Sequence, residues 1–108
     1  MKKAVWLSYD LSIKGDYEGL YSWLDDQNAK ECGDSLAFFN FDIKKDEHLA
    51  DKLKQEIENS VSLSKRDRIY IIYRDDNNKL KGTFLFGGRK SAPWTGYGIK
   101  QVVVDEDF

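Results

Sequence analysis

The sequence predicts an α+β domain of the ferredoxin-like type, in which two helices cover one face of an antiparallel sheet. Segments with strand and helix patterns follow one another in the order β-α-β-β-α-β, and two further strands come after them. The chain has 108 residues, which is the length of a single domain with one modest core. We therefore expect residues 1–108 to form one domain, in which residues 99–108 supply a C-terminal strand and an acidic tail.

The first two elements are a strand over residues 3–11 and a helix after Asp16. The strand is expected because β-branched, aromatic and aliphatic side chains follow one another there. Asp16 is a residue type that caps helix N-termini. The apolar residues after it recur at the spacing of one helix face, and they are Tyr17, Leu20, Tyr21 and Leu24.

Two hairpins and a second helix complete the pattern. Residues 29–32 and 36–41 are expected to form strands on either side of a turn around Gly33-Asp34. A helix is expected to begin at Asp46, since Leu49, Leu53 and Ile57 lie four residues apart on its apolar face. The last strands are expected over residues 68–74, 80–86 and 99–104, and turn-forming Asp and Asn residues separate the first two of these.

The apolar residues of two strands predict that the sheet is covered on both faces. Alternation places Trp6 on the face opposite Val5 and Leu7, and it places Tyr70 and Ile72 opposite the other apolar residues of their strand. Two helices cover only one face, so we expect a homodimer whose interface includes Trp6, Tyr70 and Ile72. The alternative is that the loop 87–98 and the tail fold back over this face.

Several short strings resemble small bacterial proteins similar to the second CRISPR-associated (Cas) protein. They are Ser8-Tyr9-Asp10-Leu11, Asp16-Tyr17-Glu18-Gly19-Leu20, Asp34-Ser35, Asp51-Lys52-Leu53 and Arg66-Asp67-Arg68-Ile69-Tyr70-Ile71. The virulence-associated protein D ribonucleases look like members of the same Cas-two-like superfamily, and the resemblance covers roughly residues 3–97. It implies a ferredoxin-like protomer and a homodimer whose C-terminal strand crosses to the partner's sheet. Many such relatives stand alone and have no assigned function.

The resemblance makes Asp10 the candidate catalytic and metal-binding residue. In nuclease members of the superfamily, the aspartate that ends the first strand lies near the dimer axis and binds a divalent metal, and Tyr9-Asp10 occupies the matching place. This implies Mg²⁺ or Mn²⁺ and a metal-dependent endoribonuclease or a nucleic-acid-processing accessory protein. The alternatives are a turn or interface aspartate and a non-catalytic homodimeric interaction module or antitoxin-like regulator.

Nucleic acid is a second candidate partner. Tyr9 lies beside Asp10, and the glycine-rich loop that contains Arg89 and Lys90 is a candidate anion-binding loop, so these three are candidate nucleic-acid-binding residues. The alternative is that this loop only connects two strands. A net charge of −2 argues against binding by bulk positive charge. The acidic end at Asp105–Phe108 is interpreted as a solubilising tail or as a segment that occupies a basic groove on the partner chain.

The remaining sequence features concern the compartment. Cys32 is the only cysteine, which excludes an intramolecular disulfide and suits a reducing compartment. No apolar run approaches the roughly 18 residues of a membrane span. We therefore expect a soluble, cytoplasmic protein without a membrane partner.

Overall fold

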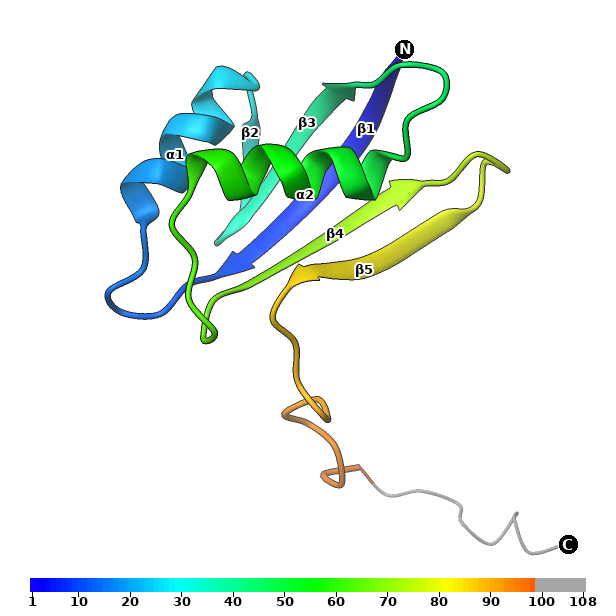
Figure 1. Cartoon of the computed structure of the whole chain (residues 1–108). Coiled ribbons are helices and arrows are strands. Elements are labelled where there is room, and N and C mark those ends of the chain that lie inside the picture. The colour runs from blue at the N-terminus through cyan, green and yellow to red at the C-terminus, as the bar shows by residue number, and fades with distance from the viewer. Residues whose placement is uncertain (99–108) are drawn as a thin grey trace, which may run out of the picture.

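The computed structural model describes residues 1–98, which form an α+β fold with a five-stranded antiparallel sheet and two helices (Figure 1). The strand order across the sheet is β2-β3-β1-β4-β5. The elements are β1 (Lys2–Asp10), α1 (Tyr17–Asp26), β2 (Lys30–Gly33), β3 (Leu36–Asp42), α2 (Leu49–Ser60), β4 (Arg68–Arg74) and β5 (Leu80–Phe86). The predicted strand 99–104 and the acidic tail lie outside the described residues.

The prediction of α1 is confirmed down to its cap, whereas the predicted start of α2 is wrong. Asp16 caps α1 by accepting a hydrogen bond from the backbone N–H of Gly19 at 2.9 Å. The second helix begins at Leu49 and not at Asp46. The reason is a local turn in which the Glu47 carboxylate accepts the backbone N–H of Lys44 at 2.7 Å. That bond holds the backbone before Leu49 in a turn, so the helix starts three residues later.

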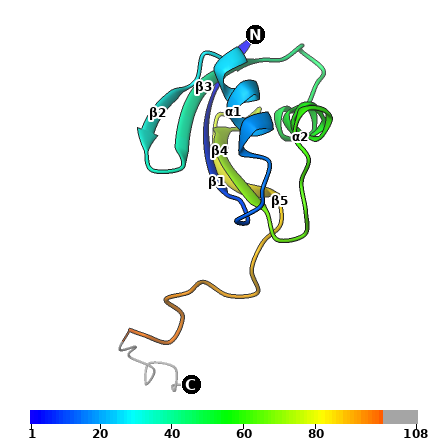
Figure 2. The same ribbon diagram turned by 90° about the vertical axis from the view of Figure 1, so that its left-hand side faces the viewer.

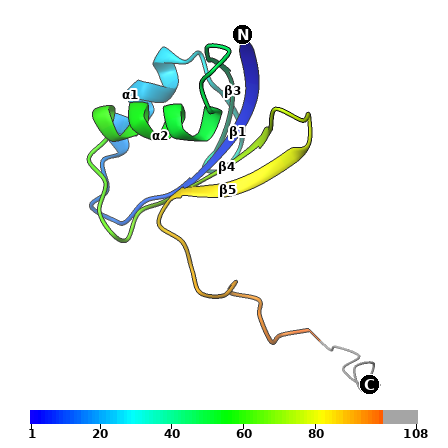
Figure 3. The same cartoon turned by 45° about the vertical axis from the view of Figure 1, so that its right-hand side comes forward.

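The hydrophobic core lies between the sheet and the two helices. Each central strand turns alternate residues toward the helices, and these residues are buried: Val5, Leu7, Phe39, Phe41, Ile69 and Ile71. Leu20, Trp23, Leu53 and Ile57 supply the helix side of the core. Trp23 contacts Phe39 edge to face, with ring centroids 5.4 Å apart. Figures 2 and 3 show both helices on the same side of the sheet.

Two aspartates fasten the loops at the end of the sheet where β1 stops. The buried carboxylate of Asp67 accepts the backbone N–H groups of Ser12 and Ser64. Asp16 accepts the backbone N–H of Ser62 in addition to capping α1. These bonds join the loop after β1 to the loop before β4, so the ends of two neighbouring strands are held in one place.

Candidate functional site

The sheet face opposite the helices carries a continuous set of apolar side chains, which we call the open face. Its large members are Trp6, Phe38, Tyr70, Ile72 and Phe84, from four adjacent strands. Trp6 and Ile72 are each 37% exposed, and Phe84 is 44% exposed. No helix or strand formed by residues 1–98 lies over them (Figures 2 and 3). The three predicted interface residues Trp6, Tyr70 and Ile72 therefore share this face.

Aromatic pairs join neighbouring strands across the open face. Trp6 lies beside Phe38 with a centroid distance of 5.0 Å, and Tyr70 meets Phe84 edge to face at 4.8 Å. Ile72 stands directly opposite Trp6 in the register of β1 and β4. Such cross-strand pairs stabilise a sheet, and here they also make the apolar surface unbroken from β3 to β5.

Gly82 keeps part of this face flat. It stands opposite Ile72 in the register of β4 and β5, and a Cβ atom placed on it would collide with the phenol ring of Tyr70. The ring of Tyr70 therefore lies over a position that has no side chain. A flat aromatic surface of this kind suits packing against a second flat surface.

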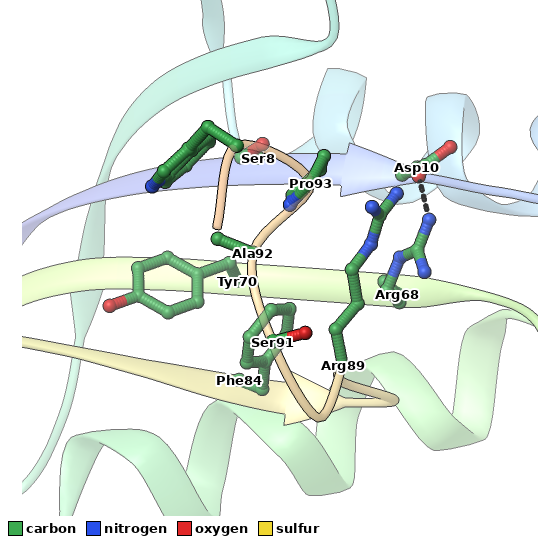
Figure 4. A pocket seen from close by; sticks show the side chains of 10 residues that line it. Ser8, Asp10, Arg68, Tyr70, Phe84, Arg89, Ser91, Ala92 and Pro93 are labelled. Atoms are coloured by element: carbon green, nitrogen blue, oxygen red, sulfur yellow. Dashed lines mark hydrogen bonds and ion pairs between the residues drawn. The ribbon is translucent and has the colours of Figure 1, made fainter. Parts of the chain in front are cut away.

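A cavity of about 510 Å³ opens at the end of the open face where β1 stops. The strands supply Ser8, Asp10, Arg68, Tyr70 and Phe84, and the chain after β5 supplies Arg89 and the residues 91–94 (Figure 4). This segment leaves the sheet toward the side opposite the helices (Figures 2 and 3). Within the described residues, the loop 87–98 thus reaches one end of the open face and leaves Trp6 and Ile72 exposed.

The charged groups of the cavity are one carboxylate and two guanidinium groups. Asp10 and Arg68 stand opposite each other in the register of β1 and β4 and form an ion pair. The side chain of Asp10 is 62% exposed, so the pair is open to solvent. Arg89 extends from the segment after β5 toward this pair (Figure 4). Since only one carboxylate lines the cavity within residues 1–98, the local charge is positive.

Tyr9, Arg89 and Lys90 do not come together in the structure. Tyr9 is on the helix side of the sheet, where its ring lies 6.0 Å from that of Tyr21. Burial there, together with a hydrogen bond to Tyr21, raises the pKa of Tyr9 to about 12. Arg89 lines the cavity on the other side of the sheet, and Lys90 is exposed beside it without lining the cavity.

Arg68, Tyr70 and Phe84 join Asp10 at the cavity although the sequence pattern did not single them out for this site. Asp10 ends β1 and Arg68 begins β4. The two residues therefore meet if these strands are adjacent and antiparallel, and this position at the strand ends is the signal in the sequence. The two aromatic residues sit opposite each other in the second hairpin, which the sequence did predict. Trp94, which also lines the cavity, lies in an irregular segment after β5, where no strand register predicts its neighbours.

Residues 1–98 do not by themselves form a set of ligands that fits Mg²⁺ or Mn²⁺. Among residues 1–98, no three His, Cys, Asp or Glu side chains gather closely enough to hold a metal ion. Within residues 1–98, Asp10 is the one carboxylate that lines the cavity, and it forms an ion pair with Arg68. An octahedral Mg²⁺ site uses one or two carboxylates together with water or phosphate oxygens, so further ligands from outside residues 1–98 would be required.

Neither helix of residues 1–98 has the length and apolar character needed to cross a membrane. In comparisons with known proteins, no family model, no curated protein and no solved structure matches this chain.

Proposed function

We propose that this protein is a non-catalytic homodimeric interaction module that associates through its open face. The observation that carries the proposal is the exposure of Trp6, Ile72 and Phe84 in one unbroken apolar surface. An apolar patch that spans four strands is a typical sign of an interaction site on a small protein. A second copy of the same face is the simplest partner, because a two-fold axis pairs an apolar surface with itself.

The shape and the edges of the open face favour a packed pair of sheets. Two sheets pack about 10 Å apart, a distance that brings large side chains of both faces into contact. The flat ring of Tyr70 over Gly82 supplies such a contact surface. Arg68 and Asp10 at one end, and Arg74 at the other end of β4, give the apolar centre a charged rim. This combination of an apolar centre with a polar rim is typical of protein interfaces.

A matched pair of isoleucine substitutions tests the proposal. Ile72→Lys places a charge in the middle of the open face, whereas Ile13→Lys makes the same change at a residue that is 99% exposed in the loop after β1. Sedimentation velocity at micromolar concentration is expected to give about twice the chain mass of 12.6 kDa for the wild type and Ile13→Lys. Ile72→Lys is expected to sediment as a monomer. A monomeric wild type would remove the proposal.

The arrangement of the first six elements supports the ferredoxin-like type and, with it, a relationship to Cas-two-like proteins. Each helix connects two strands that have one other strand between them: α1 connects β1 to β2 past β3, and α2 connects β3 to β4 past β1. Both helices lie on one face of the sheet (Figure 1). These are features of the split βαβ arrangement, to which β5 adds an edge strand.

A metal-dependent endoribonuclease is the second candidate function. Its support is the position of Asp10, which ends β1 at the mouth of a cavity that also holds Arg68 and Arg89. Arginine side chains bind phosphate groups in two-pronged geometry, so a phosphodiester would find cationic partners here. Residues 1–98 supply too few carboxylates at this place to hold a metal ion, and for this reason the candidate stands second.

Cleavage assays separate the two candidate functions. Wild type, Asp10→Asn and the exposed turn variant Asp34→Asn would be incubated with single-stranded RNA or double-stranded DNA in Mg²⁺ and in Mn²⁺. The nuclease candidate predicts cleavage by wild type and Asp34→Asn and loss of cleavage in Asp10→Asn. The interaction module predicts that none of the three proteins cuts either substrate.

A further inference from the structure

We propose that the acidic segment Asp105–Asp107 of this chain docks in the chain's own cavity beside Asp10. This inference goes beyond the proposed homodimer, because it assigns an occupant to the cavity. It rests on the chemistry of the cavity wall, on the charge of the segment and on the length of chain between them.

The cavity wall combines an apolar surface with cationic side chains. Tyr70 and Phe84 meet edge to face on the sheet side, and Phe84 is 44% exposed. Trp94, which also lines the cavity, is 74% exposed. A ligand for this cavity therefore needs apolar groups for the aromatic rings and negative charge for the two arginines.

Arg89 is the group that an acidic ligand would pair with first. It lies at the cavity together with Arg68 and forms no ion pair with any of residues 1–98. Arg68 already faces the carboxylate of Asp10. The exposed Lys90 adds a second cation next to Arg89. Counting Asp10, Arg68, Arg89 and Lys90 gives a net charge of +2 around the cavity.

The end of the sequence has the complementary chemistry. Val102, Val103 and Val104 precede Asp105, Glu106 and Asp107, so an apolar run is followed directly by three negative charges. The valines suit the aromatic wall, and the carboxylates suit Arg89 and Lys90. The sequence of residues 1–98 contains no other run of three consecutive acidic residues.

The connection is long enough for the segment to return to the cavity. Trp94 lines the cavity and Asp105 follows it by eleven residues, which span at most about 40 Å when extended. The chain already turns around Trp94, where the backbone N–H of Thr95 donates to the carbonyl of Ala92 and that of Tyr97 donates to the carbonyl of Trp94, both at 3.0 Å. Gly96 has a φ of +88°, a conformation that glycine adopts without strain.

The short connection also favours the chain's own segment over a separate acidic peptide. A site and a ligand joined by a short linker meet at an effective concentration in the millimolar range. Docking would cover Tyr70 and Phe84, which belong to the open face as well. The docked segment and a second copy of the chain therefore compete for the same two side chains.

Disulfide trapping in the full-length chain tests the docking. In a Cys32→Ser background, Ser91→Cys on the cavity wall would be combined with Asp107→Cys and oxidised at nanomolar protein concentration. The control places the first cysteine at Lys65, which is exposed in the loop before β4. The proposal expects an intramolecular disulfide at least about tenfold faster for the cavity pair than for the control pair.

Charge reversal distinguishes docking from simple proximity. Arg89→Glu is expected to slow the disulfide of the cavity pair several-fold, and Glu106→Arg in the same chain is expected to restore the rate. An unchanged rate in Arg89→Glu, or a disulfide that forms only between two chains, would overturn the proposal. The disulfide rates are measured at nanomolar protein concentration and report contacts within one chain. They therefore test the docking whether or not the proposed homodimer forms.

Competition between the docked segment and a second chain can also be measured, as a change in the strength of homodimerisation. Replacing Asp105, Glu106 and Asp107 by their amides is expected to tighten homodimerisation by at least about threefold, because the docked form no longer competes. If docking does not occur, the amide variant dimerises no more tightly than wild type. That result would contradict the proposal. Failure of every variant to dimerise would instead count against the homodimer alone, with docking decided by the disulfide rates.

Discussion

The carboxylate of Asp67 accepts the backbone N–H of Ser12 at 2.7 Å across the gap between two loops. Its second oxygen accepts the backbone N–H of Ser64 at 2.8 Å and the hydroxyl of the same residue at 3.2 Å. Ser12 follows Asp10 by two residues, and Asp67 directly precedes Arg68. One buried carboxylate therefore holds the ends of β1 and β4 in place, and with them the ion pair at the cavity.

Asp67→Asn is expected to destabilise the fold by about 2 kcal/mol, because a charged acceptor of several hydrogen bonds is replaced by a group with one oxygen. The amide NH₂ group would also face a backbone N–H. Urea unfolding of the variant measures the loss. Asp34→Asn, at an exposed turn position, serves as the control and is expected to unfold like the wild type. Equal unfolding of Asp67→Asn and wild type would contradict this role of the carboxylate.

The stability of the fold is expected to fall in acid. Burial raises the pKa of Asp67, but the hydrogen bonds from Ser12 and Ser64 outweigh it and hold that pKa below its ordinary value. Hydrogen bonds from Ser62 and Gly19 likewise lower the pKa of Asp16. A lowered pKa in the folded state adds stability that is full above the ordinary carboxyl pKa of about 4 and is lost as the pH falls below it.

Unfolding free energies measured between pH 7 and pH 2.5 check this pH dependence. The wild type is expected to lose stability below about pH 4, and Asp67→Asn is expected to lose less over the same range because one contributing group is gone. A parallel decline in both proteins would mean that Asp67 does not titrate in the way its contacts require.

Gly82→Ala is expected to disturb the open face with little effect on the core. The new methyl group would collide with the ring of Tyr70, which can rotate away toward solvent. We expect weaker homodimerisation and a loss of stability of about 1 kcal/mol or less. In a Tyr70→Ala background the same glycine substitution is expected to have almost no effect on dimerisation. An equal effect in both backgrounds would show that Gly82 does not act through Tyr70.

Asp10→Asn is expected to leave the stability of the monomer within about 1 kcal/mol of wild type, since exposed ion pairs contribute little. The side chain of Asp10 is 62% exposed, and its partner Arg68 keeps its place in β4. Thermal unfolding provides the measurement. A much larger loss would mean that Asp10 has a structural role, and the cleavage assays with this variant would then need a different substitution.

The sequence predicted the elements of this fold better than it predicted the site. The hairpin of β4 and β5 has the expected ends, because Asp75 binds the backbone N–H groups of Asn77 and Lys79 in the turn between the strands. Alternation along β1 and β4 correctly separated Trp6 and Ile72 from the buried residues. These features depend on residues close together in the chain, which a sequence pattern records.

The parts that escaped prediction depend on contacts between distant residues. Asp67 stands in a run of charged residues, Lys65 to Arg68, which is typical of a solvated surface, yet only 1% of it is exposed. Its partner Ser12 lies 55 residues away. The pairing of Asp10 with Arg68 likewise depends on the register of two strands. The separation of Tyr9 from Arg89 follows from the side of the sheet on which the segment after β5 runs.

Isotope-filtered nuclear Overhauser spectroscopy on a mixture of labelled and unlabelled chains tests the central claim most directly. The open-face homodimer predicts contacts between chains from the methyl groups of Ile72 to the rings of Trp6, Tyr70 or Phe84. The mixture would be measured at a concentration at which wild type sediments as a dimer. Contacts between chains that involve only α1 or α2, or none at all from Ile72, would contradict the claim that this face is the interface.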